Sequence, residues 1–207
     1  IFSTAATETV TMRIRLLNDV GASTYTGDGV RGVYIGAGQL EAGDCPTSYI
    51  PTAGSTVTRA ADVAQVPLGA WWPGPDAGTM LADFEIPAVN QSVALIWYFN
   101  STGTSDKISV ERRDALIRGY LSGIGLTAVD TGSAPGPHRA ALTWGGGTFR
   151  AAANATLGWQ STQSPVTPTN LWLGQRSGGI TPLNGWLRRV SYWPRRMTDG
   201  ELGTAVS

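Results

Sequence analysis

Cysteine and histidine are almost absent from this chain of 207 residues. The single cysteine, Cys45, has no partner for an internal disulfide, and the single histidine, His138, is the only imidazole available to a metal site or a catalytic triad. These counts exclude a disulfide-stapled scaffold and a zinc cluster of several Cys and His ligands. One free cysteine fits a protein made in a reducing cytosol, with an intermolecular disulfide as the minor alternative.

Charge is scarce and balanced. Charged residues make up 14% of the chain, and 15 basic side chains cancel 15 acidic ones. Typical soluble domains carry about 25% charged residues. Without a net field to attract nucleic acid or an anionic membrane, neither is an expected partner. No apolar run approaches the roughly 18 residues of a transmembrane helix, and a signal peptide's charged and apolar regions are missing, so membrane insertion is not expected.

The residues that are plentiful favour an all-β fold, since the chain has 27 glycines and 8 tryptophans. GTMLADFEIP alternates like a half-buried strand, and SVALIWYF reads as a buried one. Further candidates are KISVE, DALIRGYL, GLTAVD, HRAALTW, TFRAA, NLWLG and GWLRRVSYW. Short strands at even spacing predict one jelly roll of two antiparallel sheets over residues 66–207. Its expected core includes Met80, Phe84, Leu95, Trp97 and Leu142.

The first 50 residues offer too little for a domain. TETVTMRIRL alternates as a strand, and VRGVYIGAGQL, after a GDG turn, reads as a second. Two strands are not stable alone in water. Residues 1–50 are therefore predicted to be the last strands of a sandwich whose earlier part precedes Ile1, or a sheet completed by another chain. The start at Ile1 rather than Met agrees with a fragment.

Two local motifs sit outside the predicted strands. Residues 39–62 read QLEAGDCPTSYIPTAGSTVTRAAD, in which two X-Pro steps and the apolar Tyr49 and Ile50 predict an ordered connector rather than a flexible linker. Near the end of the chain, Thr198 and Glu201 have the spacing of a capping box. That spacing predicts one short terminal helix.

The run QLEAGDCPTSYIPTAGSTVTRAAD closely resembles a signature of tailed-bacteriophage and prophage structural proteins. PHRAALTW, NLWLG and LNGWLRRVSYWPRRMTDGEL resemble the later strands of a laminin-G-like, concanavalin A-like jelly roll. The resemblance implies a carbohydrate-binding-module-like sandwich ending at residues 1–50, a connector over 51–65 and the jelly roll over 66–207. It further implies a tail fibre, head fibre or spike of a virion made in a bacterial cytoplasm, which associates with itself and other virion proteins.

Concanavalin A-like folds include glycanases, so the carboxylates need a test. Asp83 and Glu85 share one strand face, but Leu81 and Pro87 occupy the flanking positions, and the strand-borne E-x-D-x-E triad is incomplete. His138 lies on the same side of the predicted strand HRAALTW as its apolar residues, which favours a packed side chain over a catalytic base or a metal ligand. We therefore expect no catalytic residue, no metal site and no cofactor. A calcium ion held by scattered aspartates and carbonyls stays open.

Tryptophans are the expected ligand contacts, because sugars stack their C–H faces on flat rings. Trp71, Trp72 and Trp159 lie in loop-like contexts and are the candidate ligand-binding residues. A hinge or domain-interface role is favoured for Trp71 and Trp72. The other five are expected in the core or between the sheets: Trp97, Trp144, Trp172, Trp186 and Trp193.

Three functions follow from these patterns. The leading one is a non-enzymatic virion module that presents a glycan-binding sandwich to the host surface. The alternatives are a polysaccharide-cleaving enzyme of the concanavalin A-like class and a purely architectural decoration protein.

A solvated or subunit-contact role is favoured for the arginines near the end of the chain, which are Arg188, Arg189, Arg195 and Arg196.

Overall fold

A computed structural model describes residues 13–24, 26–30, 32–41, 47–60, 62–86, 93–100, 107–114, 116–121, 125–129, 134–162, 167–176 and 181–207. The chain divides into two units, residues 1–59 and 60–207. Within the described ranges, no helix has the length and apolar character needed to cross a membrane.

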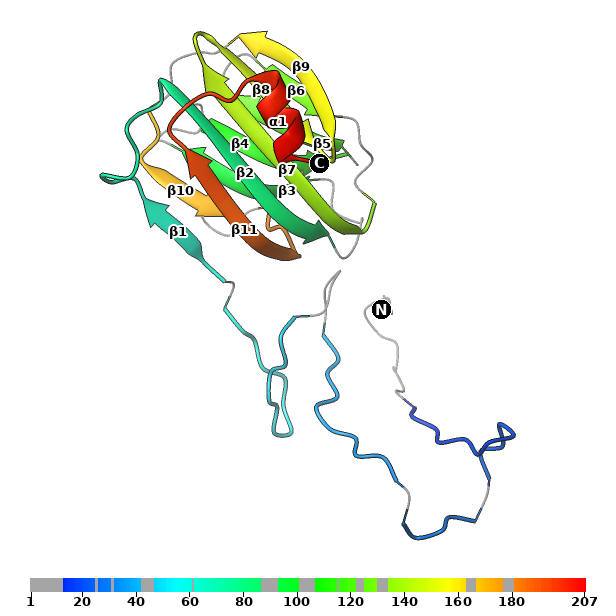
Figure 1. Ribbon diagram of the computed structural model, residues 1–207. Helices are drawn as coiled ribbons and strands as arrows, with labels where there is room; N and C mark the ends of the chain where they lie inside the picture. The colour runs from blue at the N-terminus through cyan, green and yellow to red at the C-terminus, as the bar shows by residue number, and fades with distance from the viewer. Residues whose placement is uncertain are drawn as a thin grey trace. The chain divides into compact units, whose positions relative to one another are not determined.

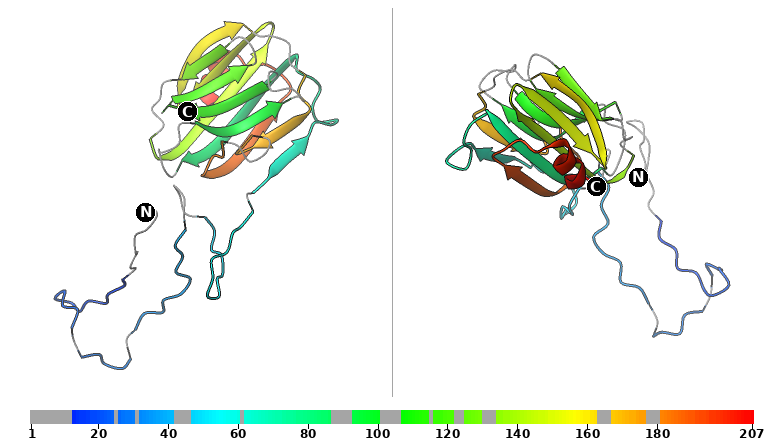
Figure 2. Two further views of the ribbon diagram at one scale, coloured as in Figure 1. Left: turned by 180° about the vertical axis from the view of Figure 1, so that it is seen from behind. Right: turned by 45° about the horizontal axis from the view of Figure 1, so that its top comes forward.

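The second unit is a sandwich of two antiparallel sheets, as predicted (Figure 1). The six-stranded sheet has the order β1 (Ala64–Pro67), β10 (Asn170–Leu173), β3 (Val93–Asn100), β4 (Lys107–Arg113), β5 (Leu116–Leu121) and β6 (Gly125–Val129). The five-stranded sheet has the order β11 (Trp186–Trp193), β2 (Ala77–Ile86), β7 (Gly136–Gly145), β8 (Thr148–Ala153) and β9 (Thr156–Thr162). The left panel of Figure 2 shows the six-stranded sheet from its outer side.

Alternate side chains of both sheets meet in the core. Met80, Phe84, Trp97 and Leu142 lie in the core between the sheets, as the alternation predicts. Leu95 is also buried, but a bulge between Leu95 and Trp97 interrupts the alternation along β3. Leu95 therefore lies opposite Glu111 on the outer side of the six-stranded sheet rather than in this cluster.

The predicted terminal helix is α1 (Asp199–Ala205). Thr198 Oγ1 accepts a hydrogen bond from Glu201 N at 3.3 Å, and Glu201 Oε2 accepts one from Thr198 N at 2.8 Å, so the capping box is complete. Leu202 and Val206 pack on the outer face of the five-stranded sheet in a second buried cluster, with Leu81, Ala141, Ala152 and Met197. The helix thus covers part of a sheet face that solvent would otherwise wet.

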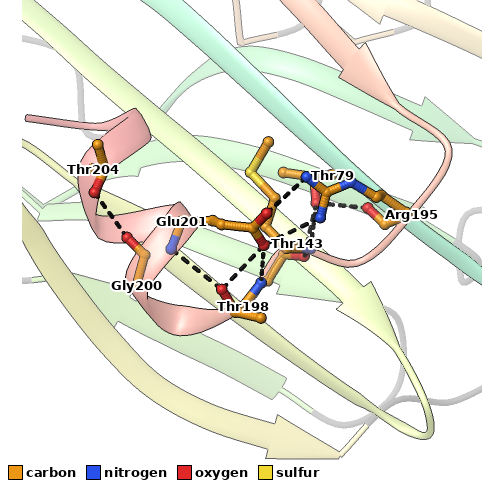
Figure 3. A network of polar contacts seen from close by, with 8 residues as sticks. Thr79, Thr143, Arg195, Thr198, Gly200, Glu201 and Thr204 are labelled. Carbon is orange, nitrogen blue, oxygen red and sulfur yellow. Dashed lines mark hydrogen bonds and ion pairs between the residues drawn. The ribbon is translucent and has the colours of Figure 1, made fainter.

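Two buried threonines hold the segment before this helix (Figure 3). The hydroxyl oxygens of Thr79 and Thr143 lie 2.8 Å apart, and Met197 N donates to both, at 3.0 and 2.9 Å. Thr79 Oγ1 also donates to the carbonyl of Arg195 at 2.9 Å. These bonds pin the C-terminal segment to β2 and β7.

The first unit has no strand or helix among its described residues. Part of the predicted strand over TETVTMRIRL, including Val10 and Met12, lies outside the described residues, as does Cys45. Large apolar side chains are exposed, among them Ile14, Leu16, Val33, Tyr34 and Leu40. The assignment of residues 1–50 to the end of a second sandwich stays a prediction.

Side chains of the signature segment close a loop within the first unit. Gln39 Oε1 accepts from Ile50 N at 2.6 Å, and the Glu41 carboxylate accepts from both Thr47 N and Thr47 Oγ1 at 2.6 Å. The two bonds from Thr47 lower the pKa of Glu41, because they stabilise its ionised form. The polar residues of the signature therefore have a local structural role.

Candidate ligand-binding face

Four residues form a row across the outer face of the six-stranded sheet. Trp172 on β10, Tyr98 on β3, Ser109 on β4 and Tyr120 on β5 lie directly opposite one another in the register. They point away from the core because their strand neighbours Leu171, Phe99, Ile108 and Leu121 belong to it. Strands spaced about 4.8 Å apart make this row about 14 Å long, which suits an elongated ligand.

The adjacent row carries charge. Glu111 on β4 lies opposite Arg118 on β5. Glu111 is only 2% exposed and accepts from Arg113 Nε at 2.8 Å. Arg118 Nη1 lies 3.9 Å from the Asp114 carboxylate, too far for a hydrogen bond. The two rows, together with Arg113 and Arg176, are called the aromatic–polar face. The rows comprise Leu95, Tyr98, Ser109, Glu111, Arg118, Tyr120 and Trp172.

Arg176 lies above Tyr98. Its guanidinium carbon is 5.8 Å from the centroid of the Tyr98 ring, within the range of a cation–π contact. Tyr98 is only 2% exposed, whereas Tyr120 and Trp172 are half-buried. The accessible rings of the face are therefore those of Tyr120 and Trp172.

Two polar atoms of this face are buried without a partner. Six such side-chain atoms occur among the described residues, namely Trp97 Nε1, Ser109 Oγ, Arg118 Nε, Trp144 Nε1, Gln175 Nε2 and Tyr192 Oη. Ser109 Oγ and Arg118 Nε belong to adjacent strands and adjacent rows of the aromatic–polar face. A buried polar group without a hydrogen bond costs about 1 to 3 kcal/mol. Such a pair on an outer face is typical of a site that water or a ligand completes.

A pocket of about 490 Å³ lies on the five-stranded sheet and differs from the aromatic–polar face. Its polar side chains have protein partners. Asp83 is bound by Arg139 Nε at 2.7 Å and by Arg189 Nη2 at 2.9 Å, and Glu85 pairs with Arg188. The two acids sit in ion pairs and are only partly exposed.

His138 lines the same pocket and is packed as expected. It is 9% exposed and stacks on Phe84 with the ring centroids 5.6 Å apart. Nε2 lies 2.8 Å from the Ala134 carbonyl, which only accepts, and Nδ1 lies 2.9 Å from the Asn154 amide nitrogen, which only donates. These partners assign the neutral tautomer with the proton on Nε2. The imidazole therefore holds the β7 start in place.

The adjacent tryptophans close one edge of the core. Trp72 packs on Phe99, Tyr192 and Trp144, with ring centroids 4.6, 5.4 and 6.0 Å away. Trp71 is 39% exposed, and its Nε1 donates to the Pro67 carbonyl at 3.1 Å. These contacts give the pair a packing role at the edge of the core, and the predicted hinge or domain-interface role stays a prediction.

Trp159, Trp172 and Trp186 differ from the sequence predictions. Trp172, expected in the core or between the sheets, points away from the core, because its strand neighbours Leu171 and Leu173 pack there. Trp159 belongs to strand β9 rather than a loop, and it is 56% exposed. Trp186 is 50% exposed rather than part of the core. β9 and β11 are the two edges of the five-stranded sheet, and edge position lowers burial in a way that local alternation does not reveal.

The candidate tryptophans do not form one site. Trp71 and Trp72 both contact Tyr192 on β11, whereas Trp159 lies on β9 at the opposite edge of that sheet. Sequence reasoning missed Ser109, Arg118 and Tyr120. The available signal was the alternation of polar with apolar residues in ISVERR and LIRGYL, two strands joined by a tight turn.

No metal centre emerges from the described part of the chain, where no three His, Cys, Asp or Glu side chains gather closely enough to hold an ion. This observation concerns side-chain ligands, and a calcium ion can also be bound mainly by carbonyl oxygens.

No family model matches the chain, and no curated protein matches it. Among solved structures, the CBM40 of the Ruminococcus gnavus IT-sialidase bound to α2,6-sialyllactose is similar, with 17% identity, a TM-score of 0.52, and coverage of 64% of this chain and 84% of that one. The Streptococcus pneumoniae NanB sialidase has 15% identity, a TM-score of 0.55, and coverage of 68% and 26%.

Mouse laminin α1 domains LG4-5 have 14% identity, a TM-score of 0.50, and coverage of 66% and 40%. The chain thus spans well under half of the NanB and laminin structures but most of the CBM40. At these identities the likeness establishes the fold, a laminin-G-like jelly-roll sandwich, as the sequence predicted.

Proposed function

We propose that residues 60–207 form a non-enzymatic glycan-binding module whose site is the aromatic–polar face. The observation that carries the proposal is the pair of buried atoms without a partner, Ser109 Oγ and Arg118 Nε, beside the half-buried ring of Tyr120. A sugar has hydroxyls that hydrogen-bond such groups and a C–H face that packs on an aromatic ring. No apolar ligand would satisfy both polar atoms.

The fold supports this choice. The R. gnavus CBM40, which is similar over most of its length, is solved with sialyllactose bound. The same architecture also serves in laminin chains, so fold alone does not select sugar binding. The side chains of the aromatic–polar face are what favour it here.

Absence of catalysis is part of the proposal. A retaining glycosidase needs one carboxyl group that stays protonated to act as general acid. Asp83 is held by Arg139 and Arg189, and Glu85 is held by Arg188, so both carboxyl groups are engaged by arginines of the protein. The polysaccharide-cleaving alternative therefore has no unengaged carboxyl group at this pair.

The setting in a bacteriophage virion is proposed from the signature segment at residues 39–62. In that setting the chain is a tail fibre, head fibre or spike component, is found in the virion, binds other virion proteins and associates with copies of itself. Several copies on one particle would turn weak single-site glycan binding into firm attachment to a cell. Electron microscopy of particles labelled with an antibody to this chain tests the location.

A glycan array probed with the full chain tests the binding itself. We expect a subset of glycans to bind, with no release of reducing sugar from any of them. Replacing Tyr120 with Ala should weaken binding, and replacing the exposed Trp186 with Ala provides a matched control on the other sheet. Failure to bind any glycan would favour the architectural alternative, and reducing-sugar release would favour the enzyme.

Trp159 remains a second candidate contact because its ring is more than half exposed. It lies outside the aromatic–polar face, so a glycan bound through Trp159 would use a separate site at the β9 edge.

A further inference from the structure

The charges of the aromatic–polar face carry an inference that rests on the proposed function and narrows its ligand. We propose that this face selects glycans that bear a carboxylate, and that Arg118 is the residue that reads the carboxylate. The proposal names the class of sugar and a specificity-determining residue, and both follow from the contacts of the described side chains.

Arg118 holds an unused binding edge. A guanidinium binds a carboxylate best through two parallel N–H donors, and Nε forms one end of such an edge. Arg118 Nε is buried without a partner. Glu111 lies opposite Arg118 in the register but bonds Arg113, and the one ion pair of Arg118 in the described part of the chain is with Asp114, whose carboxylate lies 3.9 Å from Nη1. The Nε edge of Arg118 can therefore bind a carboxylate that belongs to a ligand.

Arg118 also has freedom to turn toward a ligand. Its side chain is 17% exposed, and Asp114 is 66% exposed, so their contact is solvated and weak. Movement of the guanidinium away from Asp114 breaks no hydrogen bond described for the pair. Entry of an anion therefore requires only a side-chain adjustment.

The charge balance of the face favours an anion. Glu111 is neutralised by Arg113 at 2.8 Å. Among the described residues, Arg118 forms an ion pair only with Asp114, at 3.9 Å, and Arg176 forms none with an acidic group. Two arginines thus contribute positive charge beside the row of Tyr98, Ser109 and Tyr120. The overall chain is neutral, so this excess is a local property of the face.

Polar neighbours place the rest of the sugar. Ser109 Oγ lies in the row next to that of Arg118 and is fully buried without a partner, so it bonds a ring hydroxyl only when the side chains that cover it move as the ligand binds. Tyr120 flanks Ser109 and follows Arg118 by two residues on the same face of β5. A carboxylated sugar therefore meets an anion contact, a hydroxyl contact and a ring from adjacent positions.

The test compares matched ligands on the unaltered full chain. Oligosaccharides of uronic acid and of sialic acid are each immobilised beside a copy whose carboxylate is reduced to an alcohol, together with sulfated glycans of the same net charge. We expect the carboxylated form to bind at least ten-fold more tightly than its reduced copy, and the affinity to fall as salt rises. This comparison does not depend on the folding of any variant.

Variants then identify the residue. Arg118→Gln should abolish the preference for the carboxylated form, and Arg118→Lys, which keeps the charge but loses the planar edge, should retain only part of it. Arg188→Gln on β11 is the control, because Arg188 is an exposed strand arginine of the other sheet. Thermal unfolding of each variant checks its fold.

The outcomes separate this inference from the proposed function. Glycan binding that is indifferent to carboxyl reduction would overturn the carboxylate inference and leave the glycan-binding proposal standing. Equal binding of sulfated glycans, or an unchanged preference in Arg118→Gln, would also overturn it. Binding of no glycan at all would overturn both.

Discussion

The hydroxyl oxygens of Thr79 and Thr143 lie 2.8 Å apart across β2 and β7, and together they receive the backbone N–H of Met197. Ser109 presents the opposite case, because its hydroxyl is equally buried but has no partner among the described residues. The five-stranded sheet thus uses buried hydroxyls to fix the C-terminal segment, and the six-stranded sheet buries one hydroxyl without a partner. The difference leads to two contrasting predictions.

Thr143→Val should destabilise the fold. Valine has the shape of threonine but cannot bond Thr79 or Met197, so we expect a loss of about 1 to 3 kcal/mol in the free energy of unfolding. Urea denaturation measures it. Glycan affinity should not change, because α1 and its anchor lie on the sheet opposite the aromatic–polar face. An unchanged unfolding free energy would contradict the structural role of the pair.

Ser109→Ala should do the reverse. Removal of a buried hydroxyl that lacks a protein partner leaves no new unpaired group, so the unfolding free energy should change by less than about 1 kcal/mol. Binding of the glycans found on the array should weaken several-fold. A large loss of stability with intact binding would mean that Ser109 serves the fold and not the ligand.

The stability of the α1 cap should depend on pH. The hydrogen bond from Arg195, the largest cause, and the bonds from Thr198 lower the pKa of Glu201 from 4.5 to about 2. Because the pKa is depressed in the folded state, the contribution of Glu201 is complete above about pH 4.5 and is lost as the pH falls toward 2. Hydrogen exchange of the α1 amides from pH 6 to pH 2 should show this loss in the natural chain. Glu201→Gln should show weaker protection at pH 6 and a flatter profile, and parallel profiles would contradict the assignment.

The double variant Asp83→Asn, Glu85→Gln tests the absence of catalysis. Under the proposed function it should leave glycan affinity unchanged and lower stability only modestly, since partly exposed ion pairs contribute about 0 to 1 kcal/mol each. Incubation with polysaccharides followed by a reducing-sugar assay gives the readout. Sugar release by the natural chain that disappears in the variant would establish the enzyme instead.

Trp159→Ala decides between the two candidate sites. If the glycan binds the aromatic–polar face, affinity should stay within about two-fold of the natural chain. If it stacks on Trp159, the loss of ring contact should lower affinity ten-fold or more, corresponding to about 1 to 3 kcal/mol. Titration of the same glycan against Trp159→Ala and Tyr120→Ala separates the possibilities, because only one of the two substitutions should weaken binding.

Local pattern was sufficient for most elements of the second unit, although it missed β1 and β9. Alternation along GTMLADFEIP identified β2 and the inward side of Met80 and Phe84, and parity along HRAALTW identified His138 as packed. The T-x-x-E spacing identified α1, whose capping box depends on residues only three apart. These features rest on contacts within one strand or one turn, so neighbouring residues suffice to specify them.

The candidate site depends on strand order, which no local pattern contains. Ser109 and Arg118 are adjacent only because β4 and β5 pair in one register, and Tyr98 and Trp172 join them through β3 and β10 from distant parts of the chain. The same cause explains Trp186, whose strand alternates like a core strand yet lies at a sheet edge. By itself the sequence determined most of the segments that become strands and most of the side chains that share a face. Only the tertiary structure decided which faces meet, because sheet neighbours are chosen by packing of the whole core and not by the residues of one strand.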